Sequence, residues 1–341
     1  MEQLIINGKE ITPDNVHSAL PDAPPHLSAI RSFLNEWWND ENYITVKTSG
    51  STGTPKEVKL AKDVVVASAN QTCGFFGLNE KTTGLLCLPV HYIAGKLMLV
   101  RAIRSGMPLV AVEPTMSVIR DLEARVHFAA LIPSQVVAAL SDEAGTAKLS
   151  SIAQVLIGGG PIERDTEARL SELPSACYHS YGMTETATHV ALRRIGGDGR
   201  YRALPGVRFE TDSEGTLIIH TSNLPAPVHT TDLVELHDEQ SFTWLGRADY
   251  AVISGSVKLI PELLEKKIGH LLEPRFYLRG EADSLLGQKL VLVVEDSPWS
   301  DERIQDLLGQ LERLLDKFER PKEMRFESRF RETSTGKIRR N

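Results

Sequence analysis

Four apolar runs of strand length constrain the fold of this chain more than any other feature. They cover residues 84–88, 108–112, 128–132 and 154–157, and longer segments with helical patterns separate them. A strand that is apolar at every position is buried on both faces, as happens where helices cover both sides of a parallel sheet. We therefore expect an α/β fold with a large N-terminal domain built on mostly parallel strands.

The pattern changes after about residue 206. Apolar and polar residues alternate in the next strand-length segments, which are residues 215–220, 232–236 and 241–244, and polar turns join them. Alternation of this kind is typical of antiparallel strands with one solvated face. We expect a short antiparallel β subdomain here.

A small α+β pattern begins beyond Tyr250. Its expected strands are residues 275–278, 289–294 and 324–327, and its expected helix covers residues 301–318. Flexible and charged residues cluster just before this pattern, which is the composition of a hinge. We place the boundary near Asp249, which divides the chain into an N-terminal domain of residues 1–248 and a small, mobile C-terminal domain of residues 249–341.

The expected helix over residues 301–318 has one apolar face. Ser300 can cap its start, and Asp301 and Glu302 complement its dipole. The apolar face consists of six aliphatic residues at helical spacing: Ile304, Leu307, Leu308, Leu311, Leu314 and Leu315. We interpret this face as core packing rather than as a partner surface.

The composition of the 341 residues excludes several classes of protein. No apolar run reaches the roughly 18 residues of a membrane span, and the first residues lack a signal-peptide pattern, so we expect a cytoplasmic protein. A net charge of −7 without a basic stripe argues against nucleic-acid binding. Three cysteines lie far apart and are interpreted as small core residues rather than disulfide or zinc ligands: Cys73, Cys87 and Cys177.

A loop rich in glycine and hydroxyl side chains is the strongest candidate for a binding site. Its candidate residues are Thr48, Ser49, Gly50, Ser51, Thr52, Gly53 and Lys56. The glycines let the backbone approach a ligand, the hydroxyls donate hydrogen bonds, and Lys56 adds a positive charge. The spacing differs from that of a Walker A loop. A polyphosphate fits such a loop, and the alternative is an ordinary solvated turn.

Two further segments follow apolar strands, where α/β folds gather their ligands. Three glycines leave room for a flat ring or form a plain turn: Gly158, Gly159 and Gly160. The second segment contains Ser180, Tyr181, Gly182, Thr184 and Glu185. The Glu185 carboxylate suits Mg²⁺ held against phosphate oxygens, or it belongs to an exposed loop.

The remaining candidates lie toward the C-terminus. Asp232 can accept hydrogen bonds from both hydroxyls of a ribose, or it is a turn aspartate. Polar and flexible residues around the expected domain boundary form a second group: Arg247, Asp249, Gly255 and Lys258. Lys337 stands on a glycine-containing loop near the end of the chain, where a frayed basic tail is the alternative.

In their order and relative spacing, these segments resemble the adenylate-forming acyl-CoA synthetase superfamily, and the resemblance extends over the whole chain. It implies an enzyme that uses ATP, Mg²⁺ and coenzyme A. Residues 48–56 correspond to the loop that binds the ATP β- and γ-phosphates. The segment from Tyr181 to Glu185, which includes Thr184, corresponds to one that contacts adenine, the α-phosphate and Mg²⁺.

The same resemblance assigns roles near the C-terminus. Asp232 corresponds to the residue that holds the ribose, Arg247 to an arginine at the ribose and phosphate, and Asp249 to the hinge. Lys337 corresponds to the catalytic lysine of the small domain. The loop from Gly255 to Lys258 corresponds to one that reaches the CoA pantetheine tunnel after the small domain rotates.

The chemistry agrees with this assignment. Attack of a carboxylate on the α-phosphorus brings two anions together, so Lys337 and Mg²⁺ are needed to offset their charge. The product is an acyl-adenylate, whose acyl carbon is then open to attack by a thiol.

Within the superfamily, the chain resembles certain o-succinylbenzoate-CoA ligases of menaquinone biosynthesis. Only about 47 residues precede the phosphate loop, where the superfamily usually has roughly a hundred more, so the N-terminal domain is shortened. Residues 88–95 and 183–191 also resemble this subfamily. In residues 88–95, Tyr92 takes the place of the usual histidine, which leaves the role of His91 open. At the adenylate grip, Thr231 stands where glycine is common.

The second carboxylate of o-succinylbenzoate needs a cation or several hydroxyl donors near the acyl end. Candidates for the acyl pocket, by position, are His91, Tyr92, Thr186, Thr188, His189 and Arg193. Three alternatives stay open: another acyl- or aryl-CoA ligase, an enzyme that loads a carrier protein, and a non-catalytic nucleotide-binding relative. A homodimer is expected only by analogy.

Overall fold

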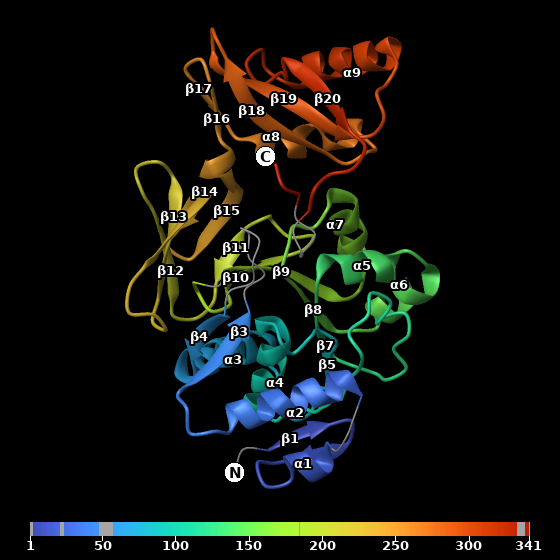
Figure 1. Cartoon of the computed structure of the whole chain (residues 1–341), viewed down its shortest axis with the longest axis vertical. Coiled ribbons are helices and arrows are strands. Elements are labelled where there is room, and N and C mark those ends of the chain that lie inside the picture. Colours follow the sequence, from blue (N-terminus) through green and yellow to red (C-terminus); the bar gives the residue numbers. More distant parts are fainter. Residues whose placement is uncertain (1–2, 21–23, 48–56, 184, 333–337, 341) are drawn as a thin grey trace. The chain divides into compact units, whose positions relative to one another are not determined.

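The computed structural model describes residues 3–20, 24–47, 57–183, 185–332 and 338–340 (Figure 1). By packing, the chain forms two compact units, one of Met1–Arg208 with His220–Val228 and the other of Phe209–Ile219 with His229–Asn341. Packing thus places residues 229–248 with the C-terminal part of the chain. The boundary near Asp249 concerns where the chain bends and stays a prediction.

A mostly parallel sheet forms the centre of the first unit, as the four apolar runs predict. Its parallel strands, in spatial order, are β1 (Leu4–Ile6), β6 (Leu109–Ala111), β5 (Gly84–Leu86), β7 (Phe128–Leu131), β8 (Gln154–Ile157) and β9 (Ala176–Gly182). Antiparallel strands extend it at both edges: β2 (Lys9–Ile11), β10 (His189–Arg194) and β11 (Tyr201–Ala203). The expected α/β class with its mostly parallel sheet is confirmed.

Helices surround this sheet (Figure 1). They are α1 (Val16–Ala19), α2 (Pro25–Trp37), α3 (Lys62–Phe76), α4 (Ile93–Ser105), α5 (Pro133–Leu140), α6 (Glu143–Ser150) and α7 (Arg164–Ser171). Gly77 and Gly106 end α3 and α4 in the left-handed conformation that glycine adopts without strain. Strand residues such as Leu131, Val155 and Ile157 are fully buried, which explains why those runs are apolar at every position.

A separate hairpin carries the predicted phosphate loop. Strands β3 (Tyr43–Lys47) and β4 (Glu57–Ala61) pair antiparallel up to Lys47 opposite Glu57. Residues 48–56 connect them and lie outside the described residues.

Four strands begin the second unit: β12 (Val207–Thr211), β13 (Thr216–Thr221), β14 (Val228–Asp238) and β15 (Ser241–Arg247), and a few terminal residues of β12, β13 and β14 belong to the first unit. Strands β14 and β15 pair antiparallel, as expected for this region. Asp232 does not begin its strand, as the sequence suggested, because β14 starts four residues earlier, at Val228. Phe209 and Phe242 are fully buried here and meet edge to face.

A five-stranded sheet and two helices complete the second unit (Figure 1). The strands are β16 (Val252–Ser254), β17 (Val257–Leu259), β18 (Phe276–Asp283), β19 (Gly287–Glu295) and β20 (Glu323–Glu327), and the helices are α8 (Pro261–Ile268) and α9 (Asp301–Leu314). Short 3₁₀ turns lie at Ala248–Tyr250 and Gly269–Leu271. Both helices pack on one face of the sheet, where Leu278, Leu290 and Leu292 are buried.

Helix α9 is shorter than the sequence predicts. The Ser300 hydroxyl accepts a hydrogen bond from the Arg303 backbone at 3.4 Å, which confirms the predicted cap. The helix ends at Leu314 rather than at residue 318, because Leu315 adopts an extended conformation. Leu307, Leu311 and Leu315 are buried as predicted, but Leu314 is 40% exposed, so its assignment to the core was wrong.

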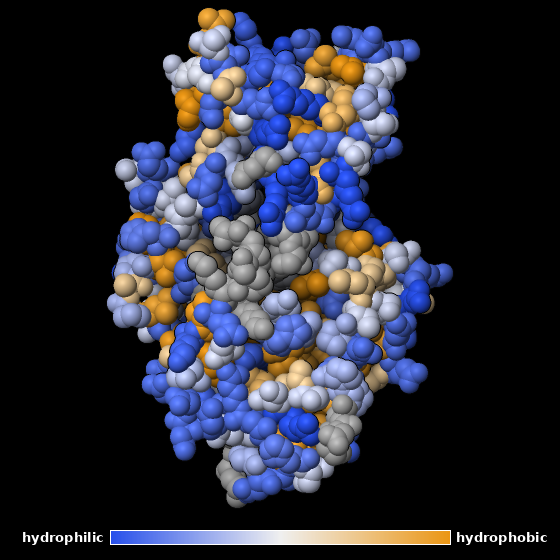
Figure 2. Space-filling model, viewed as in Figure 1, coloured by the Kyte–Doolittle hydropathy of each residue, from blue (hydrophilic) through white to orange (hydrophobic). Residues whose placement is uncertain are grey.

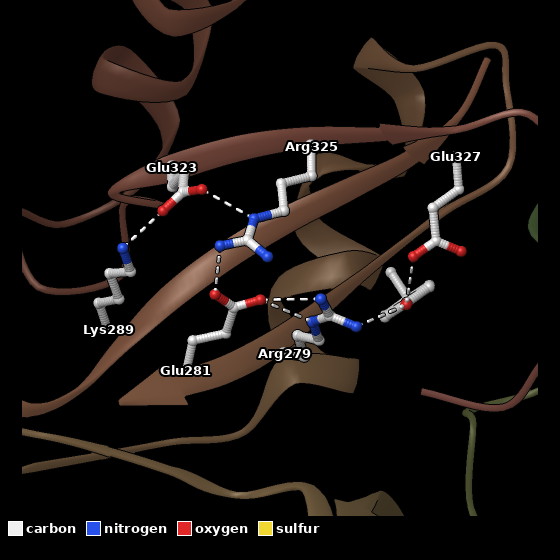
Figure 3. A network of polar contacts seen from close by, with 7 residues as sticks. Arg279, Glu281, Lys289, Glu323, Arg325 and Glu327 are labelled. Atoms are coloured by element: carbon white, nitrogen blue, oxygen red, sulfur yellow. Dashed lines mark hydrogen bonds and ion pairs between the residues drawn. The ribbon is translucent and has the colours of Figure 1, made fainter. Parts of the chain in front are cut away.

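The opposite face of this sheet carries a ladder of alternating charges across β18, β19 and β20 (Figure 3). In order along the ladder, its members are Lys289, Glu323, Arg325, Glu281, Arg279, Tyr277 and Glu327. Side chains alternate between the faces of a strand, so this face is separate from the one that α8 and α9 cover. The side chains of these ion pairs are partly buried, with exposures between 20% and 44%, so water still reaches the ion pairs and each contributes little stability.

The surface in Figure 2 is mainly hydrophilic, and its hydrophobic residues lie in small separate patches. Exposed large hydrophobic side chains come from distant parts of the sequence, such as Phe75, Met116 and Leu285. Scattered single residues of this kind are normal for a folded protein. Among the described residues, no helix is both long enough and apolar enough to cross a membrane.

Candidate active site

Several predicted site residues lie outside the described residues. They are Thr48, Ser49, Gly50, Ser51, Thr52, Gly53, Lys56, Thr184 and Lys337. Their roles stay predictions, and the structure describes how their neighbours are held.

Side chains hold the backbone of the strand that enters the predicted phosphate loop at one residue, Thr45. The Thr45 N–H donates to Glu36 at 2.6 Å, and the Thr45 carbonyl accepts from the Lys96 ammonium at 2.6 Å. Lys96 and Glu36 also form an ion pair of 2.6 Å, and the ammonium lies 4.8 Å from the centre of the Phe33 ring. Both backbone groups of Thr45 are therefore fixed three residues before the loop, by side chains of α2 and α4.

The triple-glycine turn follows β8 and lies beside β9, as the sequence suggests. A Cβ atom on Gly158 would lie 2.5 Å from the Ser180 hydroxyl oxygen, and that hydroxyl donates to the Ile157 carbonyl at 3.1 Å. The Ser180 hydroxyl therefore occupies the space in which a side chain at residue 158 would lie. This close approach of the two residues depends on glycine at that position. Cβ atoms on Gly159 and Gly160 would meet neighbours no closer than 3.6 and 3.9 Å, so the more open part of the turn lies there.

His179 connects this turn to the edge of the sheet and was not singled out from the sequence. Its Nε2 lies 3.0 Å from the Gly160 carbonyl oxygen, and its Nδ1 lies 2.7 Å from the Tyr201 hydroxyl. Burial lowers the pKa of His179 to about 4, so the ring is neutral at pH 7. A carbonyl only accepts, so Nε2 carries the proton and Tyr201 donates to Nδ1. The signal in the sequence was its position directly before Ser180.

Tyr181 and Gly182 belong to β9 itself rather than to a loop beyond its end, which corrects the expected strand boundary. Gly182 pairs with His189 of β10, so Met183 and residues 185–188 lie at the tip of a hairpin. A Cβ atom on Gly182 would lie 2.3 Å from the Thr188 carbonyl oxygen, which makes glycine obligatory there. The Tyr181 ring lies 5.7 Å from that of Tyr201.

The hairpin tip is organised by Thr186 and presents Glu185. The buried Thr186 hydroxyl accepts from the Met183 N–H at 3.0 Å and lies 2.6 Å from the Thr188 carbonyl. Its polar atom is thus used within its own loop, although we expected it in the acyl pocket. Glu185 is exposed, as a carboxylate that holds Mg²⁺ against a substrate must be. Among the described residues, no group of three or more potential ligands gathers around a metal position.

Both nitrogens of the buried His189 ring have protein partners. Nε2 lies 3.2 Å from the Thr72 hydroxyl, which itself donates to the Ser68 carbonyl, so Nε2 carries the proton. Nδ1 lies 3.2 Å from the Thr188 hydroxyl. Burial, and then the charge of Arg101, lower the pKa of His189 to about 3. His189 is therefore a neutral, satisfied side chain beside a cation.

That cation, Arg101 of α4, is 2% exposed. Within the described residues its guanidinium has no hydrogen bond or ion pair, and its Nε is buried without a partner. Burial lowers its pKa to about 10, which still leaves it charged at pH 7. The sequence held a signal that we missed, because Lys96 and Arg101 are the charged residues within the otherwise apolar buried run of α4.

The other acyl-pocket candidates are placed differently. Tyr92 precedes α4 and is 41% exposed, with its ring 4.5 Å from that of His91. Arg193 forms a two-pronged ion pair with Glu167 and lies over the Tyr201 ring. Although burial opposes the charge, this pairing raises the pKa of Arg193. Its charge is already neutralised, unlike that of Arg101.

Three predicted residues gather in the second unit. Asp232 is buried on β14 and stands opposite Arg247 of β15. The Trp244 indole N–H donates to one Asp232 oxygen at 3.0 Å and so sets the orientation of the carboxylate. Trp244 was not singled out from the sequence, although it lies on the strand expected to pair with that of Asp232.

Thr231 joins the predicted arginine to the predicted hinge. Arg247 donates to the Thr231 hydroxyl at 2.6 Å and to Asp249 at 2.7 Å, and Thr231 donates to the same Asp249 oxygen at 3.0 Å. The hydrogen bond from Arg247 lowers the pKa of Asp249. At this position the resemblance leads us to expect glycine, and the Thr231 hydroxyl gives the departure a structural role.

The segment from Gly255 to Lys258 lies at a tight hairpin between β16 and β17. Gly255 has a φ of +63°, which favours glycine, and its N–H donates to the Leu286 carbonyl at 2.8 Å. Lys258 is exposed, with its ammonium 3.9 Å from the Glu214 carboxylate. A contact with CoA stays a prediction.

Comparison with known proteins places this geometry in a family. Residues 15–215 match the family model described as AMP-binding enzyme. The probable 2-succinylbenzoate–CoA ligase of Mycobacterium tuberculosis is 31% identical, over 87% of this chain and 82% of its own length. The 2-succinylbenzoate–CoA ligase of Bacillus mycoides is 26% identical, over 86% of this chain and 68% of its own length.

Solved structures agree. An acyl-CoA synthetase (AMP-forming)/AMP-acid ligase II-like protein from Dyadobacter fermentans is 33% identical, with a TM-score of 0.66 over 94% of both chains. The o-succinylbenzoate CoA synthetase of Bacillus subtilis, in complex with its acyl-adenylate intermediate, has a TM-score of 0.69 over 86% of this chain and 67% of its own. At 21% identity it shows the shared fold. The chain belongs to the AMP-binding enzyme family.

Proposed function

We propose that this protein is an AMP-forming acid–thiol ligase that converts o-succinylbenzoate, ATP and CoA into o-succinylbenzoyl-CoA, as in menaquinone biosynthesis. The names of two curated relatives support the reaction. The observation that carries the choice of acid is the buried Arg101 without a partner. A cytoplasmic location and a homodimer stay predictions.

The reaction has two steps. A substrate carboxylate oxygen attacks the α-phosphorus of ATP, forming the acyl-adenylate and releasing pyrophosphate. The CoA thiol then attacks the acyl carbon, its proton is lost, and AMP leaves. In this scheme the Asp232 carboxylate accepts the ribose hydroxyls, and Trp244 holds that carboxylate in one orientation.

The described residues around the α-phosphate fit a magnesium nucleotide. Glu185 is an exposed carboxylate on the same hairpin as Ser180 and Tyr181, and Mg²⁺ needs only one or two protein carboxylates beside phosphate oxygens. When bound, Mg²⁺ supplies positive charge to the phosphates. Lys337 would supply a second positive charge, and Arg247 would reach the ribose and phosphate after exchanging its bond to Asp249.

The second carboxylate of the acid would account for a buried, uncompensated charge at Arg101. Burial of a cation without a counter-ion is costly, and the cost is offset when an anion arrives. Arg101 lies beside His189, whose ring is already satisfied by Thr72 and Thr188, so the guanidinium is the group left to receive the ligand. A monocarboxylic acid offers nothing to this group once its one carboxylate has reacted.

Product analysis tests the proposal. Protein, MgATP and CoA are mixed with o-succinylbenzoate, benzoate or a fatty acid, and the thioesters are identified by mass spectrometry. We expect o-succinylbenzoyl-CoA with the highest kcat/KM, and an o-succinylbenzoate analogue whose succinyl carboxylate is an amide should react poorly. Faster turnover of benzoates or fatty acids would refute the assigned acid, and transfer to a carrier protein but not to CoA would refute the assigned acceptor.

A further inference from the structure

The last described residues of the chain are tied to α8 through Arg340. Its guanidinium donates two hydrogen bonds to Glu265, at 2.7 and 2.8 Å, and lies 4.0 Å from the Glu262 carboxylate. The Arg340 side chain is 16% exposed, and so is that of Glu265. A two-pronged arginine–carboxylate bond sets orientation as well as distance, so the tail is held in one register on the helix.

Arg340 supplies the positive charge that stabilises the two carboxylates of this cluster. Burial raises the pKa values of Glu262 and Glu265, and the charge of Arg340 opposes that shift for both. One oxygen of Glu262 is buried without a hydrogen-bond donor in the part of the chain that the structure describes. Two carboxylates thus share one cation, and its removal would leave both without a counter-charge.

Arg340 also contacts the segment that follows the predicted hinge. Its guanidinium lies 5.1 Å from the centre of the Tyr250 ring and 5.9 Å from that of Tyr277. A cavity of about 140 Å³ has Arg340 in its wall together with Asp249 and Tyr250. Glu265 in turn accepts the Leu278 N–H at 2.7 Å, which joins α8 to β18. Tail, hinge segment, helix and sheet therefore meet at one guanidinium.

The backbone near Arg340 is held independently of this side chain. The Arg339 N–H donates to the Arg331 carbonyl at 2.8 Å, and Glu332 forms a β-bridge with Ile338. Ile338 packs against the apolar cluster of Tyr277 and Phe330. Loss of the Arg340 side chain would thus free the end of the tail from α8 and the hinge segment without removing the bridge.

We propose that Arg340 is a positioning residue that couples the C-terminal tail, on which Lys337 lies three residues earlier, to the hinge segment at Asp249 and Tyr250. This inference rests on the proposed function, because it assumes that Lys337 serves adenylation. Arg340 itself touches no substrate. Its role is to register the tail on α8 in the state of the enzyme that forms the adenylate.

The experiment measures the two half-reactions separately in Arg340→Gln and Glu265→Gln. Acid-dependent ATP–pyrophosphate exchange reports adenylation, and CoA attack on supplied acyl-adenylate reports the second step. We expect each variant to lower kcat for exchange at least tenfold with KM for ATP within twofold, and to keep the second step within threefold. The double variant should lose no more exchange activity than either single variant, because both substitutions break the same ion pair.

Matched variants keep the test decisive. Arg339→Gln removes a neighbouring exposed charge and should behave as wild type. Arg340→Lys keeps the charge but not the two-pronged geometry, so it should recover the fold, shown by the unfolding midpoint, while exchange stays at least fivefold low. If Arg340→Gln and Arg340→Lys are both folded and show normal exchange, or lose both half-reactions equally, the inference is wrong.

Lys337→Ala separates this inference from the proposed function. Its loss of exchange, with normal exchange in the folded Arg340 variants, would overturn the inference and leave the function intact. If the wild-type protein shows no exchange with any acid, the proposed function itself fails.

Discussion

Two arginines, one in each unit, stand in opposite electrostatic surroundings: Arg101 is 2% exposed, and the Arg340 side chain is 16% exposed. Arg101 lies on α4 near His189 of β10 and has no partner among the described residues, whereas Arg340 is shared by Glu262 and Glu265. A neutralised arginine organises the chain around it. An arginine that lacks a counter-ion costs stability, which is a reasonable cost only where a ligand supplies the anion. From this contrast we infer that Arg101 is a binding group and Arg340 a structural one.

Replacing Arg101 is expected to have the largest effect on activity. If activity does not fall, the comparison between the two arginines is wrong. Arg101→Met should lower kcat/KM for o-succinylbenzoate about 1,000-fold, or about 4 kcal/mol, because the succinyl carboxylate loses its buried counter-ion. The free energy of unfolding should rise by about 1–2 kcal/mol, since an uncompensated charge is removed. Steady-state kinetics and urea unfolding measure the two effects.

A matched substrate provides the control for Arg101. Turnover of a benzoate without the succinyl carboxylate, however slow in wild type, should change less than threefold in Arg101→Met. A uniform loss for both acids would mean that Arg101 shapes the pocket rather than binding the carboxylate.

Arg340→Met should have the opposite effect on stability. It leaves Glu262 and Glu265 without their cation, and breaking a buried pair typically costs 3–5 kcal/mol, so we expect a loss of about 3 kcal/mol, given that the group is partly exposed. Urea unfolding followed by circular dichroism measures it. An Arg340→Met variant as stable as wild type would show that the two arginines do not differ as described.

Lys96 is a second buried cation of the first unit and, unlike Arg101, has a carboxylate partner. Lys96→Met should destabilise the first unit by about 2 kcal/mol, because Glu36 keeps its charge and the Thr45 carbonyl loses its donor. The double variant Lys96→Met with Glu36→Gln removes the charge but keeps an acceptor for the Thr45 N–H, so it should recover part of this loss. Additive losses in the double-mutant cycle would contradict a coupled pair.

The neutral histidines near Arg101 and the glycine turn make stability depend on pH. His189 and His179 have folded pKa values of about 3 and about 4, below the value of about 6.5 expected when unfolded. The unfolded chain therefore binds more protons below pH 6.5, and stability should fall by about 1.4 kcal/mol per pH unit per histidine as pH drops from 6.5 toward 4. Urea unfolding at several pH values should show a slope that His189→Asn reduces by about half.

The fold was largely predictable because its signals are local. The apolar runs at residues 128–132 and 154–157 lie deep in the sheet, and burial on both faces leaves a pattern that needs no knowledge of neighbours. Strand and helix ends were less accurate. Gly182 continues β9 because β10 pairs with it, and Leu315 leaves the helix despite its suitable spacing.

The candidate site was only partly predictable because its contacts join distant residues. Strand pairing sets Asp232 opposite Arg247, and a hydrogen bond joins Arg247 to Asp249. The sequence suggested antiparallel strands here but not these contacts. Glu265 and Arg340 are 75 positions apart, and nothing in either local sequence indicates the other. For Arg101 the charge was visible, but the lack of a partner is a property of the folded surroundings.

The indole of Trp244 gives this protein an intrinsic optical reporter. Its N–H is bonded to the carboxylate that we expect to receive the ribose, so arrival of a nucleotide would alter the polarity around the ring. Tryptophan emission senses such changes without any label. Titration with ATP, compared with the Trp244→Phe protein as a blank for the other three tryptophans, would follow occupancy in real time.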